Sequence, residues 1–292
     1  MKRKEIFSGK VILLDGGMGT RLIEKGLKAG EVPESWNIAY PERIREIHQS
    51  YIRAGARIIY TNTFGANRLK LKRAQKVNFL ERFNIAGVKL AKEVANNEVL
   101  VAGDIGPTGE FLKPYGEWEE KDFYQAFQEQ VEIFLSEKVD LIVLETFSDL
   151  REIQVAVQAV KDTSNLPLFA SMSFERGKGG YKTIMGIKVE EMVEGLKDAD
   201  VIGINCGGLY PDEMGEIVKE MRKITDKPLL VKPNAGKSRI KDGKVEYELG
   251  PEEFAERMKI PIQEGAKFVG GCCGTTEKHI SLLNKLIQAS AE

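Results

Sequence analysis

Three cysteines are the residues in this chain whose type and spacing point most directly to chemistry. They are the only cysteines among the 292 residues, and two of them are adjacent in the run Gly270-Gly271-Cys272-Cys273-Gly274. The third stands in Ile204-Asn205-Cys206-Gly207-Gly208. Three thiolates suit a tetrahedral zinc ion whose fourth position stays open, which is the pattern of a catalytic rather than a closed structural site.

The glycines around the adjacent pair support this interpretation. Neighbouring side chains on an extended strand point to opposite faces, so Cys272 and Cys273 reach one ion only if the backbone bends there. Glycine on both sides permits such a bend and a close approach to a metal. Two alternatives stay open: a cysteine is often simply a small buried apolar residue, and a vicinal disulfide is conceivable, although disulfides are uncommon in reducing cytosol.

Other polar residues with a possible role follow predicted strands. The turn Asp15-Gly16-Gly17-Met18-Gly19-Thr20 offers backbone N–H groups for a carboxylate or phosphate, although it can equally be a tight turn that needs glycine. It matches neither a Walker motif nor GxGxxG, so nucleotide binding has little support. Asp15 and Glu145 can together hold an ammonium group, but an Asp at this place is also a common helix cap. Asn234 either points its amide oxygen at the zinc or a substrate, or is only a turn residue.

The elements that must position these residues are visible as eight short apolar runs. Each run precedes a glycine or polar cluster and then a segment with helical periodicity. The runs are residues 11–14, 57–61, 100–104, 141–145, 168–172, 201–205, 229–232 and 267–270. Eight strand-then-helix units predict an α/β fold, a single (β/α)8 TIM barrel over residues 1–292, with a doubly wound open sheet as the alternative. Active sites of this barrel lie at the C-terminal ends of the strands, where the three cysteines can converge.

Three connecting segments have expected structures of their own. Residues 237–247 predict a small hairpin that turns at Asp242-Gly243. Residues 106–118 and 175–186 are expected to be loops that close over a substrate, with ordinary surface flexibility as the alternative.

Composition limits the classes of partner. The chain has 43 Lys and Arg against 44 Asp and Glu, a net charge of -1, so no broad basic field is available for nucleic acid or acidic lipid. The charged N-terminus is followed by no apolar signal region, and no stretch approaches the length of a membrane span. We therefore expect a cytoplasmic protein that acts on small molecules, without nucleic-acid or membrane partners.

A zinc ion on three thiolates favours one kind of reaction. Electron-rich ligands leave the metal weakly Lewis acidic, so the site is poorly suited to making hydroxide. An incoming thiol would lose its proton on binding, against a free pKa of about 8.5, and would stay nucleophilic because the complex carries excess negative charge. With an anion nest and two carboxylates beside the metal, the inferred substrate is an amino acid that bears a thiol.

Seven segments from the first predicted strand to the last carry a family resemblance. They read LLDGGMGT, TNTFGAN, GDIGPTGE, ETFSDL, GINC, PNAGK and GGCCGTT. Together they resemble the homocysteine S-methyltransferases, most closely the N-terminal homocysteine-binding module of cobalamin-dependent methionine synthase. The resemblance implies a barrel with zinc on Cys206, Cys272 and Cys273, and with the homocysteine sulfur as the fourth ligand.

The same resemblance implies the contacts of the substrate. The homocysteine amino group would lie near Asp15 and Glu145, and Asn234 would lie close to the metal. That Asn234 occupies the open position of the metal before the substrate arrives is a hypothesis. The carboxylate would accept from the backbone N–H groups of Gly16, Gly17 and Met18. No catalytic group is expected beyond the zinc-bound substrate thiolate itself.

The methyl donor is less constrained. Members of the family use a methylated corrinoid, S-methylmethionine or betaine. Betaine is disfavoured as the methyl donor, because a quaternary ammonium group is usually bound by a cage of aromatic side chains. The betaine enzymes carry a tyrosine where this chain has Gly65. We expect methylcobalamin on a corrinoid-binding partner protein or on a missing module, since residues 1–292 leave no length for folate, cobalamin or activation modules. The alternatives are a stand-alone S-methylmethionine-dependent enzyme, a zinc-dependent thiol alkyltransferase with another acceptor, and a non-catalytic subunit that binds homocysteine and zinc.

Overall fold

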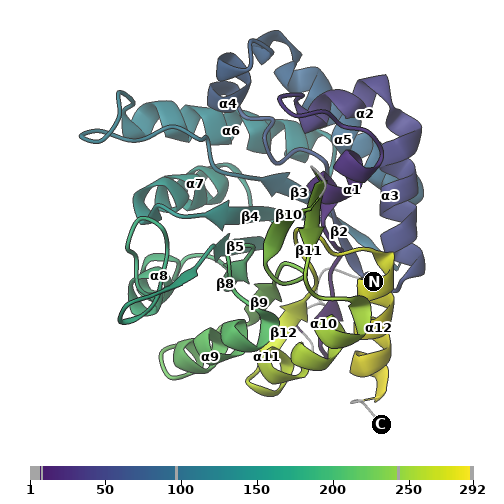
Figure 1. Ribbon diagram of the computed structural model, residues 1–292. Helices are drawn as coiled ribbons and strands as arrows, with labels where there is room; N and C mark the ends of the chain where they lie inside the picture. The colour runs from purple at the N-terminus through teal and green to yellow at the C-terminus, as the bar shows by residue number, and fades with distance from the viewer. Residues whose placement is uncertain (1–6, 8, 96–97, 242–243, 290–292) are drawn as a thin grey trace.

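Eight parallel strands form a ring in the computed structural model, which describes residues 7, 9–95, 98–241 and 244–289. The strands are β1 (Ile12–Leu13), β2 (Ile58–Tyr60), β3 (Leu100–Ile105), β4 (Leu141–Phe147), β5 (Leu168–Met172), β8 (Val201–Asn205), β9 (Leu229–Lys232) and β12 (Ala266–Val269). Their order is β1-β12-β9-β8-β5-β4-β3-β2, and a parallel bridge between Leu14 and Ile58 joins β1 to β2 (Figure 1). The predicted TIM barrel is confirmed, and the doubly wound sheet is excluded because such a sheet stays open at both edges.

Each predicted apolar run coincides with one of these strands. The ends differ by at most two residues, the largest difference being at β4, which continues to Phe147 instead of ending at Glu145. Differences of this size are ordinary at the ends of secondary-structure elements. The sequence periodicity therefore located all the strands that carry the predicted site residues.

Helices surround the strand ring on its outer side (Figure 1). They are α1 (Met18–Glu24), α2 (Trp36–Ala39), α3 (Pro41–Arg53), α4 (Arg68–Arg73), α5 (Leu80–Val94), α6 (Glu120–Ser136), α7 (Leu150–Thr163), α8 (Val189–Gly195), α9 (Pro211–Arg222), α10 (Pro251–Arg257), α11 (Lys259–Gln263) and α12 (Glu277–Ala289), with the short 3-10 helices η2 (Pro33–Ser35) and η3 (Val77–Phe79). Three of the α-helices begin at a proline, whose missing N–H is not needed in a first turn. Among the described residues, none of these helices combines the length and apolar character that crossing a bilayer requires.

The two faces of the strands contribute to separate apolar clusters. One cluster joins the outer strand faces to the helices, and the other consists of inward-facing residues, namely Ile12, Leu14, Ile58, Tyr60, Leu100, Ala102, Leu141, Val143, Phe169, Val201, Leu230 and Phe268. Because side chains alternate along a strand, a residue two positions beyond an inward one also faces inward. Asp104, Glu145 and Lys232 continue the inward rows of β3, β4 and β9 in this way. The barrel interior is thus apolar along most of the strands and charged at their C-terminal ends.

Two antiparallel hairpins extend from the loops at this end of the barrel. The predicted hairpin of residues 237–247 is confirmed as β10 (Ser238–Lys241) and β11 (Lys244–Tyr247), while its predicted turn at Asp242-Gly243 lies outside the described residues. Residues 175–186, expected as a covering loop, contain a second hairpin, β6 (Glu175–Gly177) and β7 (Gly180–Lys182). Residues 106–118 form the expected irregular loop.

The loop of residues 106–118 is anchored to α7 by the buried carboxylate of Glu152. Its Oε1 accepts from the N–H of Thr108 at 2.7 Å and from the hydroxyl of Thr108 at 2.6 Å. Burial raises the pKa of Glu152 from 4.5 to about 7, although the bonds from Thr108 oppose this shift. A group whose pKa is higher in the folded state contributes stability below its ordinary pKa and loses that contribution as the pH rises through the folded value.

This contribution gives a testable pH dependence. Between pH 5.5 and pH 8, ionisation of Glu152 is expected to lower the free energy of unfolding by about 2 kcal/mol. The Glu152→Gln variant keeps an acceptor for Thr108 but cannot ionise, so it should lack this component. Urea unfolding of both proteins at the two pH values measures the difference. An equal decrease in the two proteins would contradict the assignment.

Candidate active site

The three cysteines, which come from the ends of β8 and β12, meet at one place. Their sulfur atoms all lie within 4.8 Å of one another, and the Sγ atoms of Cys206 and Cys273 are 4.0 Å apart. A tetrahedral zinc ion with Zn–S bonds of about 2.3 Å separates its sulfur ligands by about 3.8 Å. All three thiols are free, so the vicinal disulfide is not formed. The spacing fits a zinc ion held by three thiolates.

The electrostatics of the cluster also favour a cation. Contact with Cys206, followed by burial, raises the pKa of Cys272 well above that of a free thiol. Contact with Cys272 lowers the pKa of Cys206, but contact with Cys273 and burial outweigh it and raise that pKa to about 12. Three thiolates therefore coexist here only with a compensating positive charge beside them.

The backbone bends where the sequence predicted a bend. The N–H of Cys272 donates to the carbonyl of Pro233 at 2.8 Å, and the chain then turns so that Thr275 N–H donates back to the Cys272 carbonyl at 3.2 Å. Cys206 itself has a φ of +57°, in the left-handed region that side chains other than glycine seldom adopt. Such strain persists only where surrounding contacts impose it, and it is concentrated at functional sites.

Asn234 connects the two cysteine-bearing loops. Its Oδ1 accepts from the N–H of Cys273 at 3.0 Å, and its Nδ2 donates to the carbonyl of Gly207 at 2.7 Å. The side chain thus lies beside the cysteines, but its amide oxygen already accepts one hydrogen bond from the backbone. It lines a neighbouring pocket of about 540 Å³ instead of the cavity that faces the thiols.

Asn205 was missed by the sequence analysis, although it directly precedes Cys206. Its buried Oδ1 accepts from Thr146 N–H and from the Ser171 hydroxyl, both at 2.8 Å. Its Nδ2 donates to Thr146 Oγ1 at 2.7 Å and lies 4.0 Å from the sulfur of Cys272. Asn205 therefore holds the ends of β4, β5 and β8 in a fixed relation to the sulfur of Cys272. The signal in the sequence was a polar residue at an inward position of an otherwise apolar strand.

A cavity of about 310 Å³ opens beside the thiols at the C-terminal end of the barrel. It is lined by the three cysteines and by five of the six predicted substrate-binding residues: Asp15, Gly16, Gly17, Met18 and Glu145. Among the further residues that line it, four with an ionisable side chain were not assigned to the site by the sequence analysis: Glu34, Tyr60, Asp104 and Lys232. Asp104 and Lys232 each end a predicted apolar run in the same way as Glu145.

Asp15 forms a buried ion pair with Lys232. Its Oδ1 lies 2.7 Å from the Lys232 Nζ, and its Oδ2 accepts from the N–H of Tyr60 at 2.7 Å. The Lys232 ammonium also lies 3.6 Å from the centre of the Tyr60 ring. Burial alone would lower the pKa of Lys232, but Asp15, Tyr60 and Glu145 outweigh it and raise that pKa well above its ordinary value. Lys232 is therefore a fixed positive charge inside the cavity.

The part of the cavity wall formed by Tyr60, Asp104 and Glu145 is acidic. The hydroxyl of Tyr60, Oδ1 of Asp104 and Oε2 of Glu145 are all buried without a hydrogen-bond partner. Burial raises the pKa of Glu145, and burial together with repulsion from Glu145 raises the pKa of Asp104 well above its ordinary range. Buried polar atoms are normally satisfied, so unpaired acceptors facing a cavity indicate a ligand with positively charged donors.

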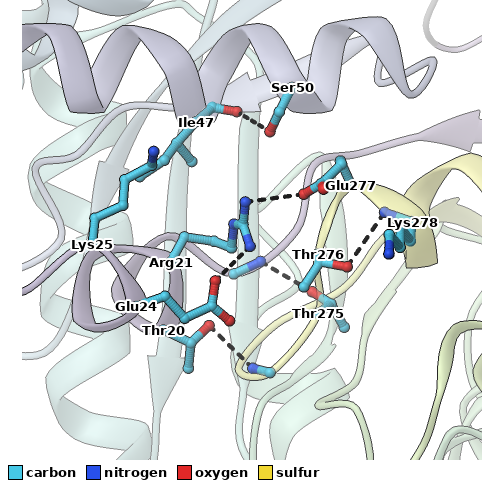
Figure 2. A network of polar contacts seen from close by, with 12 residues as sticks. Thr20, Arg21, Glu24, Lys25, Ile47, Ser50, Thr275, Thr276, Glu277 and Lys278 are labelled. Atoms are coloured by element: carbon cyan, nitrogen blue, oxygen red, sulfur yellow. Dashed lines mark hydrogen bonds and ion pairs between the residues drawn. The ribbon is translucent and has the colours of Figure 1, made fainter.

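The glycine-rich turn packs directly against the cysteine loop. Gly17 N–H donates to Thr275 Oγ1 at 3.0 Å, so one N–H of the predicted anion nest is already bonded. Thr20 Oγ1 accepts from Gly274 N–H at 3.2 Å, and Arg21 on α1 pairs with Glu277 on α12 at 3.1 Å (Figure 2). The glycine-rich turn and α1 therefore support the loop that carries Cys272 and Cys273.

Two glycines of this turn make a matched pair of variants. A Cβ on Gly17 would lie 2.5 Å from the Cys272 carbonyl oxygen, whereas a Cβ on Gly19 would meet nothing within 4 Å. We expect Gly17→Ala to displace the cysteine loop, lowering zinc affinity at least tenfold and stability by about 1–3 kcal/mol. Gly19→Ala, within α1, is expected to be neutral or more stable by about 0.5–1 kcal/mol. Chelator competition and urea unfolding measure both effects, and equal zinc affinity in the two variants would contradict the contact.

Comparisons with known proteins agree with this geometry. The family model described as homocysteine S-methyltransferase matches residues 12–287. Methionine synthase of Mycobacterium tuberculosis (strain ATCC 25618 / H37Rv) is 30% identical, over 94% of this chain and 24% of that protein, so the chain spans about a quarter of this relative. Betaine–homocysteine S-methyltransferase 1 of Danio rerio is 29% identical, over 97% of this chain and 74% of that protein. The metallated form of the homocysteine methyltransferase MmuM from Escherichia coli has the same fold, with a TM-score of 0.78, 24% identity and coverage of 97% of this chain and 98% of that one.

Proposed function

Because this chain belongs to the homocysteine S-methyltransferase family, we propose that it methylates homocysteine on a zinc ion held by Cys206, Cys272 and Cys273, and so forms methionine. The observation that carries the proposal is the convergence of the three sulfur atoms, within 4.8 Å, on a cavity with charged walls. We take residues 1–292 as one homocysteine-binding domain.

The residues around the cysteines have separate roles in this reaction. Zinc bound there would lower the pKa of an incoming thiol and keep it as a thiolate at neutral pH. Asn205 and Asn234 hold the cysteine loops in place, and the acidic wall receives the ammonium group of the amino acid. The substrate sulfur then forms a bond to the donor methyl group while the bond between that methyl group and the donor breaks, and the electron pair leaves with the donor. No covalent intermediate with the protein is needed.

The proposed donor is a methylated corrinoid, methylcobalamin, carried by a partner protein or a further module. Exposed apolar side chains stand on three connections at the cavity end of the barrel: Phe111 and Tyr115 after β3, Ile184 after β7, and Ile240 and Val245 on the β10–β11 hairpin. Apolar groups exposed on the loops around an active site suit the docking of another protein surface.

Gly65 argues against betaine as the donor. A Cβ at this position would lie 2.8 Å from the Glu34 Oε1, and the Gly65 N–H donates to the same oxygen at 2.5 Å. The place where betaine enzymes carry a tyrosine is therefore filled by a carboxylate. A second candidate donor is S-methylmethionine, since the carboxyl group of Glu34, which also lines the cavity, suits a sulfonium cation.

The experiment is single-turnover methionine formation by the zinc-loaded protein with homocysteine. Methylcobalamin, S-methylmethionine and betaine are offered in parallel, and Cys273→Ala is the control. Methionine from methylcobalamin, absent in the variant, supports the proposal and a corrinoid-carrying partner. Turnover with S-methylmethionine alone would make this a self-sufficient enzyme. If homocysteine ligates the metal but no donor reacts, the chain is a binding subunit. If homocysteine does not ligate the metal, the methyl acceptor is another thiol.

A further inference from the structure

Tyr247 lies over the turn that follows the adjacent cysteines, and it has no role in the reaction described above. It is the last residue of β11. A Cβ built on Gly274 would lie only 2.2 Å from the Tyr247 Cγ, so the aromatic ring takes the space that a side chain at this position would need. Gly274 also has a φ of +78°, in the left-handed region that favours glycine. The ring is therefore in close contact with the backbone directly after Cys273.

Backbone hydrogen bonds hold Tyr247 in this place. The Ala235 N–H donates to the Cys273 carbonyl at 2.9 Å, and the Ala235 carbonyl accepts from the Leu249 N–H at 3.0 Å. Tyr247 itself pairs in register with Ser238, at the base of the β10–β11 hairpin. The base of the hairpin and the cysteine loop are therefore joined through Ala235, and this connection sets the position of the ring relative to Cys273.

The hydroxyl of Tyr247 interacts with one of the three sulfur atoms. It is a hydrogen-bond partner of the Cys273 thiol, and the other two cysteines lie near enough for their charges to act on it. The phenol is protonated at neutral pH, because its ordinary pKa is about 10 and burial raises that pKa further. A metal-bound thiolate has no proton and can only accept, so the hydroxyl is the donor in this contact. Hydrogen bonds to an ionised acceptor are roughly twice as strong as those between neutral groups.

Each of the three sulfur atoms has a separate donor beside it. These donors are the N–H of Gly207 for Cys206, the Nδ2 of Asn205 at 4.0 Å for Cys272, and the hydroxyl of Tyr247 for Cys273. Three thiolates exceed the charge of one zinc ion, and a bound substrate thiolate would add to this excess. Donors to the ligating sulfur atoms stabilise such an anionic complex and tune the metal.

We propose that Tyr247 is a positioning residue of the metal site, whose hydroxyl donates to the sulfur of Cys273 and whose ring fixes the turn at Gly274. The inference rests on the proposed function, because it takes the three cysteines as zinc ligands. The β10–β11 hairpin is then a part of the metal site and not only an exposed connection at the end of the barrel. Without the hydroxyl, the anionic complex loses a donor that stabilises it.

The test uses Tyr247→Phe, which keeps the ring over Gly274 and removes only the hydroxyl. Zinc affinity, measured by chelator competition, should fall about 10- to 100-fold, as is usual when an outer partner of a metal ligand is removed. Cobalt(II) in place of zinc adds a spectroscopic measurement. The sulfur-to-cobalt charge-transfer band should move to lower energy in the variant, because an electron leaves a thiolate more easily once its hydrogen bond is lost.

Tyr210→Phe is the matched control. The Tyr210 hydroxyl donates to Glu248, the residue that follows Tyr247, so this variant loses the same group from a contact with the same hairpin. Its zinc affinity should change less than threefold, and its charge-transfer band should stay at the position of the wild type. A purely structural role of the hairpin would make the two variants alike.

The outcomes separate this inference from the function it rests on. If the band of Tyr247→Phe stays at the wild-type position, or if Tyr210→Phe changes both measurements as much, the hydroxyl does not act on the sulfur and the inference is overturned. If the wild type gives no sulfur-to-cobalt band, the cysteines do not bind the metal, and the proposed function fails together with the inference. If Tyr247→Phe does not fold, a fluorinated tyrosine in place of Tyr247 decides. Its more acidic hydroxyl is a stronger donor, so the band should move to higher energy, and an unmoved band overturns the inference.

Discussion

Replacement of Cys272 by alanine is expected to abolish zinc binding and methyl transfer together. Apparent binding energies of about 10–16 kcal/mol for zinc on four protein ligands imply a loss of about 100- to 1,000-fold in affinity when one thiolate is removed. Two remaining thiolates, held 4.0 Å apart, cannot complete a site that is open to substrate. Methionine formation should fall by at least the same factor. Zinc content after dialysis and the single-turnover rate are the measurements.

The control for this prediction is Ser238→Ala. Ser238 lies on the exposed strand β10 and, like the cysteine variant, loses one side-chain heteroatom. It should keep one zinc ion per chain and the rate of the wild type. A Cys272→Ala protein that retains one zinc ion per chain would show that groups other than the three cysteines hold the metal.

Replacement of Lys232 by methionine is expected to cause the largest loss of stability. It leaves Asp15 buried without its partner, and breaking a buried ion pair in this way costs about 3–5 kcal/mol. The side-chain volume is nearly kept, so the effect reports the uncompensated charge and not a cavity. Urea unfolding at neutral pH measures it. A partial recovery is expected in the Asp15→Asn, Lys232→Met double variant, because both charges are then removed.

An exposed ion pair provides the matched control. Lys161 lies 3.1 Å from Asp200, but these side chains are 35% and 41% exposed. Water screens such a pair, so Lys161→Met should cost less than about 1 kcal/mol. If Lys232→Met costs no more than Lys161→Met, Asp15 is not held as a buried carboxylate and its pairing with Lys232 carries no stability.

The sequence alone determined the parts of this protein that depend on local patterns. The runs ending at Glu145, Asn205 and Lys232 are short and almost continuously apolar, as buried parallel strands are, and this local property predicted all eight strands. Once the barrel was recognised, its topology brought the strand ends together. That is why Cys206 could be placed beside Cys272 without any knowledge of distances.

The tertiary structure decided which charges meet and which stay unpaired. Lys232 and Asp15 are 217 residues apart, and nothing near either residue in the sequence shows that one neutralises the other. The pairing depends on the ring order, which puts β12 alone between β1 and β9, and on the register that turns Lys232 inward. Polar contacts act over a few ångströms, whereas sequence patterns report only which face of an element is buried. The convergence of the three cysteines was therefore predictable from the sequence, and the free acceptors of Asp104 and Glu145 only from the folded chain.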